Sequence, residues 1–140
     1  MKIAFDTNVL LDAIANRAEY REAQALIMKV ADERIEGLVA ASSITDIYYI
    51  ARKIIGDERA RDAIRNLLKV FSVAGVDDMI CLSALDIPMK DYEDAVLAVC
   101  SARANADYIA TRDKEFLESN SPVPAKSPRD LLDIIEGGAL

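Results

Sequence analysis

Short apolar runs rich in β-branched residues alternate along this chain with longer segments in which apolar residues recur every three or four positions. The short runs predict strands because no polar residue interrupts them. Strands of this kind, separated by helices, are typical of a mostly parallel sheet that is covered on both faces. The predicted strands are Lys2–Phe5, Gly37–Ala41, Phe71–Val76 and Tyr108–Thr111, and the Pro-flanked run Val123–Lys126 is a weaker candidate for a fifth.

The longer segments predict amphipathic helices. In one of them, apolar residues fall at i, i+3, i+4, i+7, i+8 and i+11, which places them on one helical face. The predicted helices are Tyr20–Val30, Ile44–Ile55, Ala60–Phe71 and a last one around Leu131–Ile135 that ends at Gly137.

The length of 140 residues fits one compact domain. Hydrophobic residues make up 52% of the chain and charged residues 29%, so the chain can bury a core and intrinsic disorder is excluded. No repeat, linker or change of composition divides the chain. We therefore expect a single α/β domain over residues 1–136, with a mostly parallel sheet of four or five strands, and a short C-terminal tail at 137–140.

The distribution of apolar residues argues against a membrane partner. The longest apolar run, Ala95–Cys100, has six residues, whereas a membrane-spanning helix needs roughly 20. Asp6 interrupts the only apolar stretch near the start, so we expect no signal peptide. The two cysteines, Cys81 and Cys100, are too few for a disulfide scaffold and favour buried thiols in a reducing compartment. The expected location is the cytoplasm.

The chain contains no histidine. This excludes Ser-His-Asp and Cys-His nucleophile systems, histidine general bases and histidine metal ligands. Two separated cysteines also provide too few ligands for a thiolate zinc site. Any hydrolytic chemistry must therefore come from carboxylates, from lysines, or from a hard cation that carboxylates hold.

Two aspartates follow predicted strands directly. Asp6 comes after Ile3–Phe5, and Asp113 comes just after Tyr108–Thr111. Ligand sites in open α/β sheets lie outside the carboxyl ends of the strands, so both side chains are expected at the same edge. Taken singly, Asp6 could instead cap a following helix, and Asp113 could be an ordinary turn residue.

Asp46 and Asp94 lie in segments that resemble capping boxes, Ser43-Ile44-Thr45-Asp46 and Asp91-Tyr92-Glu93-Asp94, each followed by a helical pattern. The first turns of both helices can face the same edge of the sheet. Each aspartate alone could serve only to cap its helix. Four separate elements that each bring one carboxylate to a common edge favour a site, because close carboxylates repel one another and stabilise a fold poorly.

A cluster of carboxylates without histidine or thiolate suits Mg²⁺ or Mn²⁺. Such an ion lowers the pKa of a bound water, polarises a phosphoryl oxygen and fixes the geometry of attack. The ligand types therefore indicate metal-assisted phosphodiester hydrolysis, but they do not identify the substrate.

Three motifs resemble those of the PIN-domain nucleases, and the similarity covers roughly residues 1–130. They are Asp6-Thr7-Asn8-Val9-Leu10-Leu11-Asp12, Asp91-Tyr92-Glu93-Asp94-Ala95 and Ile109-Ala110-Thr111-Arg112-Asp113-Lys114-Glu115-Phe116. The resemblance implies a Rossmann-like three-layer α/β/α sandwich with an acidic Mg²⁺ or Mn²⁺ pocket, and endoribonuclease activity. Small single-domain members of this family (VapC-like) are often the toxin of a toxin–antitoxin pair, which implies a cognate antitoxin and a homodimer.

The resemblance also assigns residues. Asp6, Asp94 and Asp113 match the first, third and fourth acids of the family and would hold the metal. The second motif departs from the family pattern, because Asp46 stands where the family usually has the longer Glu. Asn8 and Thr111 match polar residues that orient the acids, although helix capping by Asn8 and a strand-end hydrogen bond from Thr111 are alternatives.

Three further acids of these motifs are expected outside the catalytic set. We expect Asp12 to be a surface residue near the pocket, Asp91 to be only a helix cap, and Glu93 to face solvent.

The net charge of −7, from 17 basic and 24 acidic residues, argues against a nucleic-acid partner unless basic residues gather locally. Arg61, Arg65 and Lys69 recur every four residues and form a basic stripe, and Arg112 adjoins Asp113, so these four are possible RNA contacts. The alternative for the stripe is a solvated helix face with Asp57–Arg61 and Asp62–Arg65 pairs.

The leading hypothesis is a metal-dependent endoribonuclease of the toxin type. A second is a catalytically weak or inactive PIN-like protein that regulates through partner association, because its second acid is shorter. A third, phosphoryl transfer through an aspartyl intermediate at Asp6, is disfavoured because Asn8 stands where such phosphatases carry a second acid.

Overall fold

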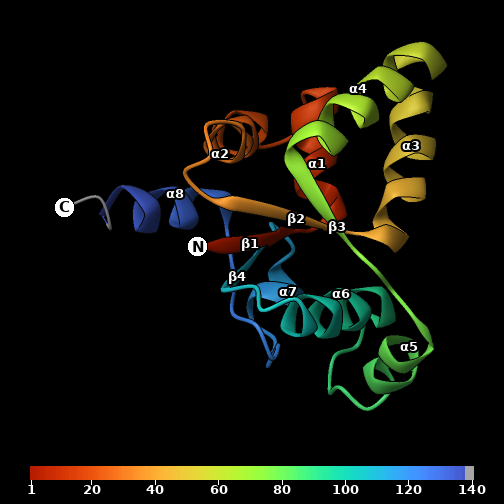
Figure 1. Ribbon diagram of the computed structural model, residues 1–140, viewed down its shortest axis with the longest axis vertical. Helices are drawn as coiled ribbons and strands as arrows, with labels where there is room; N and C mark the ends of the chain where they lie inside the picture. Colours follow the sequence, from red (N-terminus) through yellow and green to blue (C-terminus); the bar gives the residue numbers. More distant parts are fainter. Residues whose placement is uncertain (138–140) are drawn as a thin grey trace.

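The computed structural model describes residues 1–137, in which five strands and eight helices form three layers (Figure 1). All neighbouring strands are parallel, in the order β3-β2-β1-β4-β5. The strands are β1 (Lys2–Phe5), β2 (Glu36–Ala40), β3 (Phe71–Ala74), β4 (Tyr108–Ala110) and β5 (Ala125–Lys126). The helices are α1 (Thr7–Ala15), α2 (Tyr20–Ala31), α3 (Ala41–Ile55), α4 (Asp57–Val70), α5 (Asp78–Ala84), α6 (Tyr92–Arg103), α7 (Lys114–Leu117) and α8 (Pro128–Gly137).

The predicted fold class, an α/β/α sandwich around a parallel sheet, is confirmed. β1 occupies its predicted residues, β2 is shifted by one residue at both ends, and β3 and β4 end two residues and one residue earlier than predicted. The fifth strand is reduced to Ala125–Lys126, because Pro122 and Pro124 lack the N–H group that a sheet ladder needs. The last helix ends at Gly137, as predicted, and residues 138–140 of the predicted tail lie outside the described residues.

Each face of the sheet buries its own hydrophobic cluster. Ile3 and Phe5 pack with α1–α4 and α8, whereas Ala4 points to the other face and packs with α5, α6 and α7. Figure 1 shows the two helical layers above and below the strands. Successive side chains of β1 enter opposite clusters, and Ile3, Ala4 and Phe5 are fully buried. β1 therefore lies at the centre of the molecule.

The order in which strands join the sheet switches sides at β1. The chain moves outward from β1 to β2 and β3, and then returns to add β4 and β5 on the other side of β1. Such a switch point opens a crevice at the carboxyl ends of the two central strands. The N–H of Asp6 donates to the carbonyl of Ala110 at 2.9 Å, so the residues that follow β1 and β4 leave the sheet side by side.

A partly buried ion pair ties α1 to the segment after β4. Asp12 of α1 is only 1% exposed, and its carboxylate accepts two hydrogen bonds from Arg112, at 2.5 Å from Nε and 3.2 Å from the terminal nitrogen. Arg17 lies 3.4 Å from the same carboxylate. The prediction that Asp12 is a surface residue is wrong, because the two arginine side chains cover it.

Within the described residues, no helix has both the length and the apolar character needed to cross a membrane.

Replacing Asp12 with Asn should lower the free energy of unfolding by about 2 kcal/mol, because two arginines lose a buried charged acceptor. The matched control is Asp62→Asn, which removes a carboxylate whose pair with Arg65 is about two-thirds exposed on both sides; it should cost at most about 0.5 kcal/mol. Urea denaturation of both variants measures the difference. Equal losses would show that the Asp12 pair does not hold this edge of the fold.

Candidate active site at the carboxyl edge of the sheet

Asp6 lies at the end of β1, directly before α1, and is 8% exposed. It occupies the N-cap position of α1, but its side chain makes no capping hydrogen bond. Its Oδ2 instead accepts a hydrogen bond from the Thr111 hydroxyl at 2.8 Å. Burial raises the pKa of Asp6, the hydrogen bond from Thr111 opposes this rise, and the charges of Asp113 and Asp91 add to it.

Thr111 connects Asp6 to Asp113. Its buried side-chain oxygen donates to Asp6 and accepts a hydrogen bond from the backbone N–H of Asp113 at 3.1 Å. Asp113 also caps α7, because its Oδ1 accepts from the N–H of Glu115 at 3.0 Å. Two roles were expected for Thr111: a hydrogen bond at the strand end, and orientation of the acids. The same two hydrogen bonds fit both roles.

Asp94 approaches this edge from the first turn of α6. Asp91 caps that helix by accepting a hydrogen bond from the Asp94 N–H at 3.1 Å, as predicted. Burial and, to a smaller extent, the negative charges of Asp6, Asp91 and Asp113 together raise the pKa of Asp94 to about 7. Asp6, Asp94 and Asp113 therefore lie close enough to repel one another, although they come from three different elements.

The capping box predicted around Asp46 is wrong. β2 runs directly into α3, which begins at Ala41, so Ser43 lies inside the first turn and is buried. Ala40 precedes the helix and offers no side-chain acceptor. Asp46 therefore lies in the second turn of α3, where it is exposed.

Glu93 is exposed, as predicted, but it lies near Asp46 of α3. Partial burial and the interaction with the Asp46 carboxyl raise the pKa of Glu93, and the charges of Asp91 and Asp6 add to this rise. Glu93 thus links Asp46 on α3 to the acids of α6 and β1. In the sequence, only the position of Glu93 beside Asp94 could have indicated that Glu93 lies near the other acids.

In residues 1–137, no ion pair includes Asp6, Asp46, Asp94 or Asp113. In the same range, no group of three or more acid or cysteine side chains is arranged so that it could hold a metal ion. The donor set nevertheless fits Mg²⁺ or Mn²⁺, because it consists only of oxygens. Mg²⁺ keeps several waters and commonly takes one or two protein carboxylates together with substrate phosphates.

Asn8 lies apart from these contacts. Its Oδ1 receives a long hydrogen bond of 3.5 Å from Arg17, and no hydrogen bond joins it to the acids in the part of the chain that the structure describes. Its predicted role in orienting the acids stays a prediction.

The predicted RNA contacts are engaged with neighbouring groups. Arg61 pairs with Asp57 at 3.1 Å, and Arg65 pairs with Asp62 at 2.8 Å, all four groups being exposed. Lys69 makes a 3.4 Å hydrogen bond within α4. Arg112, as described above, pairs with the buried carboxylate of α1. The stripe on α4 thus has the internal ion pairs that the alternative interpretation expects.

The fold is similar to that of solved toxin–antitoxin proteins. VapBC2 from Rickettsia felis, bound to a DNA fragment of its promoter, has a TM-score of 0.70 at 12% identity over 91% of this chain and 98% of that one. VapC20 of Mycobacterium tuberculosis, a toxin that cleaves the sarcin-ricin loop, has a TM-score of 0.67 at 16% identity over 81% and 92%. A toxin–antitoxin complex from Klebsiella pneumoniae has a TM-score of 0.65 at 20% identity over 90% and 97%.

A comparison with curated proteins finds no match. The sequence does match the PIN domain over residues 2–115, which is well over half of its length. This range contains Asp6, Asp46, Asp94 and Asp113, the four acids that the sequence motifs singled out. The chain therefore belongs to the PIN-domain family.

Proposed function

We propose that this protein is a divalent-metal-dependent endoribonuclease that hydrolyses RNA phosphodiester bonds. One observation carries the proposal. The pKa of Asp94 is raised to about 7 by burial and by the nearby charges of Asp6, Asp91 and Asp113, at the edge of the sheet where the switch point lies. Repulsion of this kind costs stability unless a cation binds there, and groups with perturbed pKa values at a crevice are typical of functional sites.

In this proposal, Asp6, Asp94 and Asp113 hold Mg²⁺ or Mn²⁺, directly or through water. The bound ion would supply a water of lowered pKa and polarise the phosphoryl oxygen. Thr111 keeps the Asp6 carboxylate and the backbone of Asp113 in place through its two hydrogen bonds. Asp46 assists by orienting the attacking water, with Glu93 beside it.

RNA as the substrate class is supported by the family and by a structural relative. The solved toxin VapC20 of M. tuberculosis is described as cleaving the sarcin-ricin loop, and it shares this fold. The net charge of −7 does not oppose this proposal, because many of the acids belong to the site and a bound cation would offset them.

A cognate antitoxin is the partner that we propose. The relatives from R. felis and K. pneumoniae were solved as toxin–antitoxin complexes. An apolar groove of about 400 Å³ lies between α1, α2 and α4, with Ile27, Met28 and Val70 in its lining. Met28 and Val70 are substantially exposed, as is typical of surfaces that bind a partner.

A homodimer is proposed on similar grounds. α5 and the residue after it expose Met79, Leu82 and Leu85, each more than 60% accessible. They recur every three residues, so they share one side of this short segment. A second copy that covered them would remove apolar surface from water.

The second candidate function is a PIN-like regulatory protein without catalysis. Two observations favour it: Asp46 is short and exposed, and the described residues contain no ready-made three-acid metal cage. The two candidates differ in whether metal-dependent turnover occurs.

With Mn²⁺ or Mg²⁺ present, the protein should cleave RNA, and excess EDTA should abolish the cleavage. Asp94→Asn should lower the rate by more than about 100-fold, because it removes a charged oxygen ligand from the proposed ion. Electrophoresis of a mixture of end-labelled RNAs measures the rate.

The matched control is Asp133→Asn, which neutralises an exposed acid on α8 away from the site and should leave the rate within about twofold. Cleavage that persists in EDTA or in Asp94→Asn would contradict the metal mechanism. Mn²⁺ binding and tight antitoxin binding without turnover would favour the regulatory protein.

The raised pKa of Asp94 also predicts how stability depends on pH. Between its ordinary pKa of 3.8 and its value of about 7, the folded protein binds more protons than the unfolded chain. Without metal, the free energy of unfolding should therefore fall as the pH rises through this range. Asp94→Asn carries no charge, so at about pH 8 in EDTA it should be more stable than wild type by on the order of 2 kcal/mol.

The advantage of Asp94→Asn should shrink towards about pH 4, where the wild-type carboxyl is protonated, and Mn²⁺ should stabilise wild type alone at pH 8. Urea titrations at both pH values, with and without Mn²⁺, measure these effects. A variant that is no more stable than wild type at pH 8 would show that the acids are not held in mutual repulsion.

A further inference from the structure

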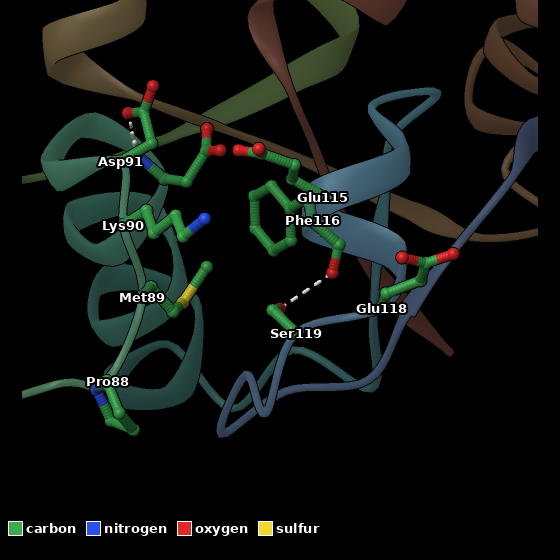
Figure 2. Close-up of a pocket in the computed structure, with 9 residues that line it drawn as sticks. Pro88, Met89, Lys90, Asp91, Glu115, Phe116, Glu118 and Ser119 are labelled. Atoms are coloured by element: carbon green, nitrogen blue, oxygen red, sulfur yellow. Dashed lines mark hydrogen bonds between the residues drawn. The ribbon is translucent and has the colours of Figure 1, made fainter.

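A pocket of about 330 Å³ opens beside the acids. Two segments line it: residues 88–91 with Asp94, at the start of α6, and residues 115–119 of α7 and the turn after it (Figure 2). Because Asp94 belongs both to this pocket and to the proposed metal site, anything bound in the pocket lies next to the group that would be hydrolysed. We call this cavity the Lys90 pocket.

Lys90 is the one cationic residue in the lining, and four carboxylates accompany it. Figure 2 shows its ammonium group projecting into the pocket between Asp91 and Phe116. Within residues 1–137, no ion pair includes Lys90, although acids stand on both sides of the cavity. Its charge is therefore available to an anion, whereas Arg61, Arg65 and Arg112 already have carboxylate partners.

The rest of the lining suits a nucleobase. Pro88, Met89 and the fully buried Phe116 provide an apolar floor and wall. The exposed carboxylates of Glu115 and Glu118 are acceptors only, which fits the exocyclic amino groups of cytosine, adenine or guanine. The volume is at the lower end of the range for small-molecule sites, so one nucleotide fits and a stacked run does not.

We propose that the Lys90 pocket binds the nucleotide that flanks the scissile phosphate of a single-stranded RNA. Lys90 contacts the backbone phosphate of that nucleotide, and its base enters the pocket, with a preference for bases that carry an amino group. This inference rests on the proposed nuclease function. In it, Lys90 is the main phosphate contact, in place of the basic stripe of α4.

The test measures RNA binding by fluorescence anisotropy with saturating Mn²⁺. The probes are labelled 12-nucleotide oligocytidine and oligouridine, which differ in the exocyclic group of the base, and every protein carries Asp113→Asn so that the RNA stays intact. Lys90→Ala should weaken binding of oligocytidine by about tenfold. It should also reduce the slope of log Kd against log salt by about 0.7, the amount for one phosphate contact to a single strand.

Two further variants make the test specific. Lys90→Arg should keep the salt slope, because it keeps the charge. Arg34→Ala removes the same charge from an exposed residue just before β2, at the opposite edge of the sheet, and should change neither Kd nor slope by more than about twofold. The affinity of Lys90→Ala for Mn²⁺, measured by calorimetry, should not fall, which separates phosphate binding from support of the acids.

Equal Kd values and salt slopes for Lys90→Ala and Arg34→Ala would overturn this inference. So would equal affinity for oligocytidine and oligouridine. Either result would leave the nuclease proposal standing. Failure of the Asp113→Asn protein to bind either RNA, together with failure of wild type to cleave RNA, would instead reject both proposals.

Discussion

Repulsion among carboxylates is the constraint around which this fold is organised. Two unit charges about 4 Å apart repel by roughly 4 kcal/mol at an effective dielectric of 20, and neighbouring acids help to raise the pKa of both Asp6 and Asp94. The hydrophobic clusters on the two faces of the sheet oppose this cost. They bury Ile3, Ala4 and Phe5 of β1 and fix β4 beside this strand, so Asp6 is held next to the residues that follow β4.

The group that hydrogen-bonds to Asp6 does not neutralise its charge, because Thr111 is a neutral donor. Arg112, which precedes Asp113 in the sequence, donates its hydrogen bonds to Asp12 of α1. The Asp12–Arg112 pair thus fixes the position of the segment that carries Asp113. The site retains a negative potential that a divalent cation can satisfy, and Lys90 stands at its border, where a phosphate would lie.

The sequence predicted the layers, the parallel sheet and most element positions, because uninterrupted apolar runs and helical stripes report burial directly. It also indicated that Asp6 and Asp113 would lie at the same edge of the sheet, because strand ends share an edge, and Thr111 bonds to both of them there. It failed at Ser43, where β2 continues into α3 without a loop, so no capping residue marked the start of the helix. Asp12 was misplaced because Arg112, which pairs with it, comes from a distant segment. The nearness of Asp46 to Glu93 was missed for the same reason.

The most direct test of this account is anomalous diffraction from crystals grown with Mn²⁺ at about pH 8, where the Asp94 carboxyl is ionised. The account predicts an anomalous peak at the carboxyl edge of the sheet, with one or two carboxylate oxygens of Asp6, Asp94 or Asp113 about 2.0–2.2 Å away and water completing the shell. A crystal saturated with Mn²⁺ that shows no peak at this edge, or that shows the acids turned towards lysine or arginine side chains, would contradict it.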